Sequence, residues 1–357
     1  MSWLIVVLGF CVLIILPELG HFTVAKVVGM RVEKFSLFFP PTIWSKKVGE
    51  TEYAVGAIPA GGYVRISGMN PSEDLPEEVR DRAYHAQPVW KRMAVIAAGP
   101  FVNFVLAIVL LFTAFWAFGP IDVTSTVDTT KPGSPAAAVL KPGDKVIAVD
   151  GQKGDPTKFV RLISAHHCAG GIKKQGCPAT TPATITVLRD GQLETFKVIP
   201  RYDTTVGRPL IGFQYASKRS PMPAGQAFST SMDRFWFITR ETIKLPAYIF
   251  NPEKRKQISG IVGTSDAAHK AIAADAADAI FLFAVISLSL AIINLFPFLP
   301  LDGGHIFWAV VEWVRRRPVP YAVMERAGVI GFMLVIGLFL LGLTNDIDRL
   351  TNGTSVR

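Results

Sequence analysis

The sequence predicts a polytopic α-helical membrane protein of about four transmembrane helices, with β-structure in the segments that join them. Half of the 357 residues are hydrophobic, only 18% are charged, and the mean hydropathy is +0.35. Four apolar stretches are each near or above the roughly 18 to 20 residues with which a helix crosses a hydrocarbon core of ~30 Å. These observations exclude a disordered chain and an ordinary water-soluble enzyme, because so much apolar surface must face something other than water.

The four apolar stretches run from residue 3 to about residue 28 and over residues 93–118, 279–301 and 327–344. No basic residue precedes the first stretch and no small-residue cleavage site follows it, so we expect a retained helix and not a signal peptide. The net charge is +9, but the Lys and Arg residues are scattered and lie partly beside the apolar stretches. A lipid bilayer is therefore the expected partner, and no nucleic-acid surface is predicted.

Basic residues also predict the orientation of the chain. The short connection between the third and fourth stretches carries Arg326 and three consecutive arginines at residues 315–317, whereas the amino terminus has no basic side chain. Cytoplasmic loops carry the excess of Lys and Arg, so this connection is expected in the cytoplasm. Residues 29–92 then lie on the cytoplasmic side, and residues 119–278 lie outside.

The outer segment begins with a β-rich unit and continues into an amphipathic connector. Asp150-Gly151 and Asp190-Gly191 are hairpin turn signals that join alternating strands. Residues 224–250 combine aromatic and polar side chains in a pattern that predicts a helix at the outer membrane surface.

An insertion in the β-rich unit, over residues 166–182, carries two cysteines. Cys168 and Cys177 lie on the side of the membrane predicted to be oxidising, so a disulfide between them is expected. A metal site built from these cysteines with His166 and His167 is the alternative.

Ionisable residues occur in two of the apolar stretches, where they are energetically costly and mark function. Residues 3–16 make about 21 Å of helix, so Glu18 and His21, which follow, fall within the hydrocarbon depth. Asp302 follows a proline-rich end of the third stretch, and broken backbone at membrane depth is tolerated only where it is buried in protein or lines a wet cavity. We therefore expect Glu18, His21 and Asp302 to meet in one hydrated pocket.

A Glu, a His three positions later and a distant Asp are part of a catalytic zinc site. In a helical His-Glu-x-x-His motif, two imidazoles on one face bind the metal and the Glu deprotonates the bound water. A third ligand, here Asp302, leaves one coordination position open for water and substrate. In this sequence, however, Pro17 stands where the first histidine should be.

These residues and several further motifs resemble the site-2 protease family of intramembrane zinc metalloproteases, in its bacterial RseP-like branch. The resemblance covers nearly the whole chain, with a single PDZ unit where the best-known relatives have two. The matching motifs are Glu18-Leu19-Gly20-His21-Phe22, Gly61-Gly62-Tyr63-Val64, Ala98-Gly99-Pro100 with Asn103, the PDZ-like residues 133–151, and Leu301-Asp302-Gly303-Gly304-His305.

The resemblance implies a domain organisation. The expected segments are residues 1–28 (transmembrane helix with the active-site motif), 29–92 (cytoplasmic loop with a membrane-associated β-hairpin), 93–118 (second transmembrane helix), 119–203 (extracytoplasmic PDZ domain), 204–278 (extracytoplasmic connector with the amphipathic segment), 279–305 (third transmembrane helix with the Leu-Asp-Gly motif), 306–326 (cytoplasmic loop) and 327–357 (fourth transmembrane helix and tail).

The resemblance also implies roles for individual residues. Glu18 would act as general base and acid, and His21 and Asp302 would bind Zn²⁺. The substrate would be held by Asn294 and, in extended form, by the hairpin edge at Gly61, Gly62, Tyr63 and Val64.

The partners implied are single-span membrane proteins, such as anti-sigma factors or remnant signal peptides, in the bacterial inner membrane. The PDZ unit would bind a peptide ligand or the trimmed end of a substrate and act as a size filter. A small β-domain serving only as a spacer is the alternative for this unit.

Pro17 leaves several explanations open. Proline cannot bind a metal and removes a helical hydrogen bond, so His21 and Asp302 would be two ligands where three are usual. The chain is then an inactive relative that binds partners without cleavage, or a copy of an active enzyme in which the ligand at position 17 alone has been lost. Alternatively, His305 replaces the missing zinc ligand. Intact Glu18 favours the isolated loss. A Glu18–His21 pair that only stabilises the helices, and a transporter with a proton relay, are the remaining alternatives.

Overall fold

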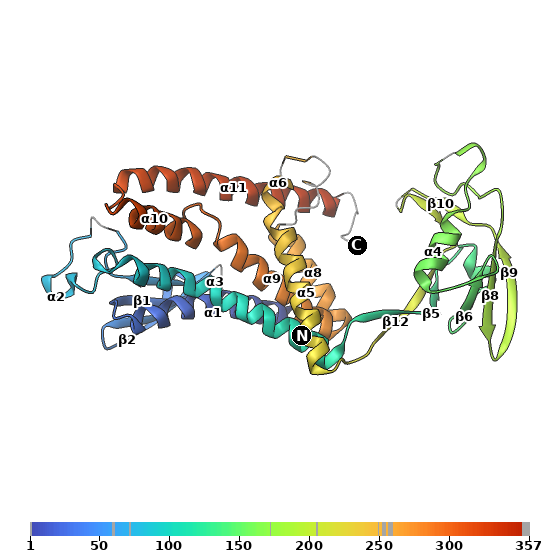
Figure 1. Ribbon diagram of the computed structural model, residues 1–357, viewed down its shortest axis with the longest axis horizontal. Helices are drawn as coiled ribbons and strands as arrows, with labels where there is room; N and C mark the ends of the chain where they lie inside the picture. The colour runs from blue at the N-terminus through green and yellow to red at the C-terminus, as the bar shows by residue number, and fades with distance from the viewer. Residues whose placement is uncertain are drawn as a thin grey trace. The chain divides into compact units, whose positions relative to one another are not determined.

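The computed structural model describes residues 2–58, 61–70, 73–171, 173–204, 206–248, 250–251, 255 and 260–351. The chain divides into two compact units (Figure 1). Unit 1 comprises Met1–Ala117 and Met222–Arg357 and holds most of the helices, and unit 2 is Phe118–Pro221 and is built on a β-sheet.

Four helices of unit 1 are long and apolar enough to cross a membrane. They are α1 (Ser2–Val27), α3 (Val89–Thr113), which continues as a π-helical turn (Ala114–Phe118), α9 (Ala276–Asn294) and α11 (Tyr321–Thr351). The prediction of about four spanning helices is confirmed for the part of the chain that the structure describes. Many of their apolar side chains are exposed on the protein surface, as expected for helices that face lipid.

Helix α3 packs against both α1 and α9, which contact each other little. Ala107 of α3 packs with Leu288 and Ile292 of α9 in a buried cluster. Helix α5 (Ala224–Ile243), from the predicted amphipathic segment, joins this cluster through Ile238. The segment is helical, and its apolar face packs on α3 and α9.

A four-stranded sheet follows α1. Its strands are β1 (Val32–Leu37), β2 (Phe39–Val48), β3 (Thr51–Ile58) and β4 (Tyr63–Ile66), in the order β2-β3-β1-β4. Strand β1 pairs parallel with β3 and antiparallel with β4, which leaves β4 at an edge of the sheet. This sheet includes the hairpin that the sequence predicts within residues 29–92.

Ion pairs hold the β2–β3 hairpin against the end of α1. Glu50, in the turn, accepts hydrogen bonds of 2.8 Å from Arg82 and from Lys26 near the carboxyl end of α1. The hydrogen bonds from these two cations lower the pKa of Glu50 to about 2, so the carboxylate stays charged at neutral pH.

Helical structure is interrupted between α9, which ends at Asn294, and α10 (Asp302–Arg315), which begins at Asp302. Residues 306–326, expected as a cytoplasmic loop between two spans, are helical as far as Arg315, where α10 ends. The turn from α9 into α10 is tight, since a Cβ added to Gly303 or Gly304 would overlap the backbone of residues 295–299. Glycine is therefore required at both positions.

The shorter helices of unit 1 are α2 (Glu77–Arg80), a 3-10 turn (Tyr84–Ala86), α6 (Leu245–Tyr248) and α8 (Ile261–Ala274).

In its described residues, unit 2 is an antiparallel sheet with one α-helix packed on it. The strands are β5 (Ile121–Thr130), β6 (Lys145–Val149), β7 (Gln152–Lys153), β8 (Ala183–Arg189), β9 (Gln192–Val198), β12 (Phe213–Arg219) and the separate pair β10 (Arg201–Asp203) and β11 (Arg208–Leu210). Helix α4 (Pro156–Ser164) packs its Phe159 into the core with Val149 and Ile185. Two 3-10 turns, Ala136–Ala138 and Ala169–Gly171, complete the unit.

Both predicted Asp-Gly turns form hairpins, β6–β7 and β8–β9, with positive φ at each Asp and each Gly. That geometry matches the right-handed twist of the strands. The compact unit extends to Pro221 because β12 returns to pair with β5. That unit 2 contains a PDZ domain over residues 119–203 stays a prediction.

The insertion carries a disulfide between Cys168 and Cys177. His166 is engaged elsewhere: its Nε2 lies 2.9 Å from Asp150 and its Nδ1 lies 2.8 Å from the Thr181 hydroxyl. Among the described residues no group of three or more His, Cys, Asp or Glu could hold a metal ion, so the alternative of a metal site here has no support.

A buried ion pair stabilises unit 2 and gives a testable prediction. Asp144 is 1% exposed and accepts hydrogen bonds from Arg189 at 2.6 and 2.8 Å. Replacing Asp144 by Ala removes the buried partner of the guanidinium, whose side chain is 15% exposed, and breaking a buried pair in this way typically costs about 3–5 kcal/mol. We expect Asp144→Ala to accelerate hydrogen exchange markedly in peptides from β6 and β8.

Glu194→Ala is the matched control, because Glu194 pairs with the same arginine but is 39% exposed. Its effect should be about 0–1 kcal/mol. The hydrogen bond from Arg189 holds the pKa of Asp144 below its ordinary value of 3.8, so the stabilisation is present above about pH 4 and is lost as the pH falls below it. Equal exchange rates for the two variants would contradict this role of the pair.

Candidate functional site

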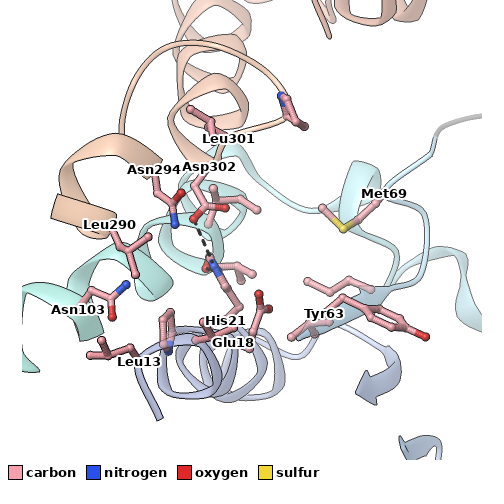
Figure 2. A pocket seen from close by; sticks show the side chains of 17 residues that line it. Leu13, Glu18, His21, Tyr63, Met69, Asn103, Leu290, Asn294, Leu301 and Asp302 are labelled. Carbon is pink, nitrogen blue, oxygen red and sulfur yellow. Dashed lines mark hydrogen bonds and ion pairs between the residues drawn. The ribbon is translucent and has the colours of Figure 1, made fainter. Parts of the chain in front are cut away.

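Helix α1 carries the first part of the candidate site. It continues through Pro17 without interruption, although proline removes the hydrogen bond to the carbonyl of Leu13. Glu18 and His21 are three positions apart, so they lie on one face of the helix. That face points into a cavity inside unit 1 (Figure 2).

His21 contacts two other helices. Its Nδ1 donates a hydrogen bond of 2.8 Å to the backbone carbonyl of Val95 on α3. Its Nε2 lies 3.4 Å from a carboxylate oxygen of Asp302, in the first turn of α10. The bond to Val95 fixes the ring orientation and directs Nε2 toward Asp302. The predicted convergence of Glu18, His21 and Asp302 is what the structure shows, and Figure 2 shows the three side chains facing one another.

Glycine on α3 permits this arrangement. The imidazole of His21 lies directly against Gly99, and a Cβ at that position would overlap the ring. Helix α3 therefore approaches α1 more closely here than it could with any other residue type at position 99. The motif around Gly99 thus has a steric explanation.

The edge strand β4 lies next to Glu18. A Cβ added to Gly62 would be 3.1 Å from the Glu18 Cγ, so the chain entering β4 passes directly against the aliphatic part of this side chain. Tyr63 and Val64 line the cavity beside it. Of the predicted hairpin-edge residues, Gly61 and Gly62 do not line the cavity, and Gly61 lies against the Phe39 ring.

The cavity has a volume of about 430 Å³ and collects residues from five elements. Asn294, at the end of α9, lines it as predicted. Asn103, Leu290 and Met69 also line it, and the sequence predicts no role for these three residues. For Asn103 a signal existed in its motif with Gly99, because residues four apart on a helix share a face.

The side chains present offer two metal ligands. His21 and Asp302 converge as ligands do, but Pro17, which also lines the cavity, stands in the third position and has no donor atom. A catalytic zinc site takes three protein ligands. In the described part of the chain no group of three His, Cys, Asp or Glu is placed to hold a metal, so His305 does not complete the set. The residues that the structure describes therefore do not fit a complete catalytic zinc site.

Comparison with known proteins identifies the family. The model of peptidase family M50 matches residues 5–338. The chain belongs to peptidase family M50. A putative zinc metalloprotease of Brucella suis is 30% identical over 94% of this chain and 92% of its own length. A putative zinc metalloprotease of Clostridium perfringens is 30% identical over 95% of this chain and 96% of its own length. The zinc metalloprotease Rip1 of Mycobacterium bovis is 31% identical over 95% of each chain.

The M50 assignment confirms the family predicted from the motifs. Members with these names are metalloproteases, and zinc is the cofactor expected for the family. The family and the four apolar helices indicate a multi-pass membrane protein that meets a lipid bilayer and membrane-protein substrates. The RseP-like branch and the roles of the individual site residues stay predictions.

The contact at Gly99 gives a second prediction. We expect Gly99→Ala to displace the His21 ring and to lower the thermal stability of the detergent-solubilised protein, because overpacking typically costs about 1–3 kcal/mol. Gly337→Ala on α11 is the control, since its added Cβ would meet nothing within 4 Å and Ala favours a helix. If the two variants unfold at the same temperature, the close approach at Gly99 is not a constraint.

Proposed function

We propose that this chain has the substrate site of an intramembrane zinc protease of the site-2 type, and that Pro17 alone prevents it from completing the metal site. As it stands, the chain captures a transmembrane segment of a single-span protein without cutting it. The observation that carries the proposal is the approach of His21 Nε2 and an Asp302 carboxylate oxygen to 3.4 Å in a cavity that also contains Glu18.

The roles follow from chemistry and position. His21 and Asp302 are the two remaining zinc ligands, and Glu18 beside them is the group that would move a proton to and from the reacting water. A zinc ion held by His21, Asp302 and a third ligand would supply Lewis-acid activation of the water and the scissile carbonyl. Retention of Glu18 in a chain that lacks one ligand supports a loss confined to position 17.

The substrate would bind in extended form. A peptide bond inside a helix has its carbonyl hydrogen-bonded and shielded, so a transmembrane segment must unwind before it can be attacked. Strand β4 pairs with β1 on one side and ends the sheet on the other, so its outer edge can accept an added strand. Gly62, Tyr63 and Val64 would then place that strand beside Glu18, with Asn294 contacting it from α9.

The partners proposed are those of the predicted branch. Single-span proteins of the bacterial inner membrane, such as anti-sigma factors or remnant signal peptides, are the substrate class. Unit 2 would act outside the membrane as a PDZ domain that binds the trimmed end of such a protein and excludes larger ones.

Zinc content tests the proposal directly. We expect the purified chain to contain clearly less than one zinc per molecule, measured by inductively coupled plasma mass spectrometry. Pro17→His, which supplies the third ligand, should raise this to about one zinc per molecule. It should also produce cleavage of a model single-span substrate in detergent or liposomes.

Two further variants separate the causes. Pro17→Ala removes the proline from the helix without adding a ligand, so it should gain neither zinc nor cleavage. The double variant Pro17→His with Glu18→Gln should keep zinc and lose cleavage, because only the proton-transfer group is missing. Stoichiometric zinc in the unmodified chain, or no cleavage by the Pro17→His chain, would refute the proposal.

A further inference from the structure

Asn103 is a buried amide in the wall of the cavity for which the site described above has no use. It lies on α3 one turn beyond Gly99, on the face that contacts His21. The residue is 1% exposed, and its side chain lines the same cavity as Glu18 and Asp302 (Figure 2).

Only one end of this amide has a partner. The hydroxyl of Ser287, which is fully buried on α9, donates to the backbone carbonyl of Asn103 at 3.0 Å and to its Oδ1 at 3.4 Å. Within the described residues nothing accepts a hydrogen bond from Nδ2. The single hydroxyl proton of Ser287 is shared between these two acceptors, and the contact with Oδ1 is the longer one. It favours the orientation in which Oδ1 faces Ser287 and the two N–H groups face away, and Figure 2 shows the amide nitrogen on the Leu290 side.

Nδ2 is not among the fully buried polar atoms that lack a partner, so it borders the open space of the cavity. A backbone carbonyl without a donor is unfavourable in an apolar environment. An unwound transmembrane segment brings such carbonyls into the cavity. Strand β4 pairs with one edge of that segment and leaves the carbonyls of the opposite edge unpaired. The amide of Asn103 offers a donor of the kind that these carbonyls lack.

Building on the proposed function, we propose that Asn103 donates a hydrogen bond from Nδ2 to a backbone carbonyl of the captured segment, and that Ser287 is a positioning residue that holds the amide in the required orientation. The contact is independent of side-chain identity in the segment. It therefore selects for an unwound backbone and not for a sequence.

The test uses the full chain, unmodified at Pro17, in detergent micelles. The probe is a fluorescent synthetic single-span peptide with a Gly-Ser break at its centre, and its affinity is measured by fluorescence anisotropy. Asn103→Leu, which keeps the approximate volume and removes the donor, should weaken binding about five- to tenfold, as expected for one buried hydrogen bond.

A thioamide scan of the probe separates a direct contact from a structural effect. A thioamide replaces one carbonyl oxygen by sulfur, a weaker acceptor, and leaves the rest of the peptide unchanged. One thioamide position near the break should weaken binding to the unmodified chain several-fold and have no effect on binding to Asn103→Leu. Such non-additivity marks a pair of groups in contact.

Serines on α9 provide the matched controls. Ser287→Ala should weaken binding about two- to threefold, because the donor remains but is no longer oriented. Ser289→Ala removes a serine of the same helix that contacts Thr242 at 3.5 Å and not Asn103, so it should leave the affinity unchanged. These variants also keep the inference testable if Asn103→Leu fails to fold.

Each outcome has one meaning. If the unmodified chain binds the probe but the thioamide profiles of the unmodified chain and of Asn103→Leu are the same, the proposed contact is wrong and the proposed function stands. Equal affinities for Ser287→Ala and Ser289→Ala would refute the positioning role of Ser287. If the unmodified chain does not bind the probe, the proposed function itself fails.

Discussion

The site depends on one imidazole that joins three helices. His21 belongs to α1, donates to the Val95 carbonyl of α3 and faces the Asp302 carboxylate of α10. These residues are distant in sequence, and their approach requires that α3 present Gly99, which has no side chain, at the point of contact. Because each interaction fixes a different helix, the position of Asp302 relative to Glu18 is set by the packing of the entire helical unit, and a local change in any one helix alters the site.

Elements of the fold are predictable from the sequence where a local pattern has a single physical explanation. Long apolar runs require a membrane, and the Asp-Gly turns require positive φ, so the spanning helices and two hairpins of unit 2 were predictable. The convergence of Glu18, His21 and Asp302 followed from the cost of ionisable groups at membrane depth. The start of α10 at Asp302 was missed, because proline and glycine signal a break and do not show how soon a helix resumes.

The parts that could not be predicted are tertiary. No periodicity indicates that the Asn103 amide is oriented by Ser287, since the two lie 184 positions apart and meet only when α3 packs on α9. The amphipathic pattern of α5 is equally compatible with a lipid surface and with a helical partner, and the structure packs it on α3 and α9. The consequence of Pro17, in contrast, is predictable from the sequence alone. The proline side chain has no donor atom for a metal, whatever the fold around it.

The turn between α9 and α10 has a consequence for how this region can vary. It has Asn294 at one end and Asp302 at the other, and its interior backbone packs against Gly303 and Gly304 so closely that no methyl group fits. The seven residues between those two side chains therefore act as a spacer of fixed length. Substitutions can change the side chains that line the cavity. An insertion or deletion in this spacer, whatever its residues, would separate the Asn294 amide from the Asp302 carboxylate.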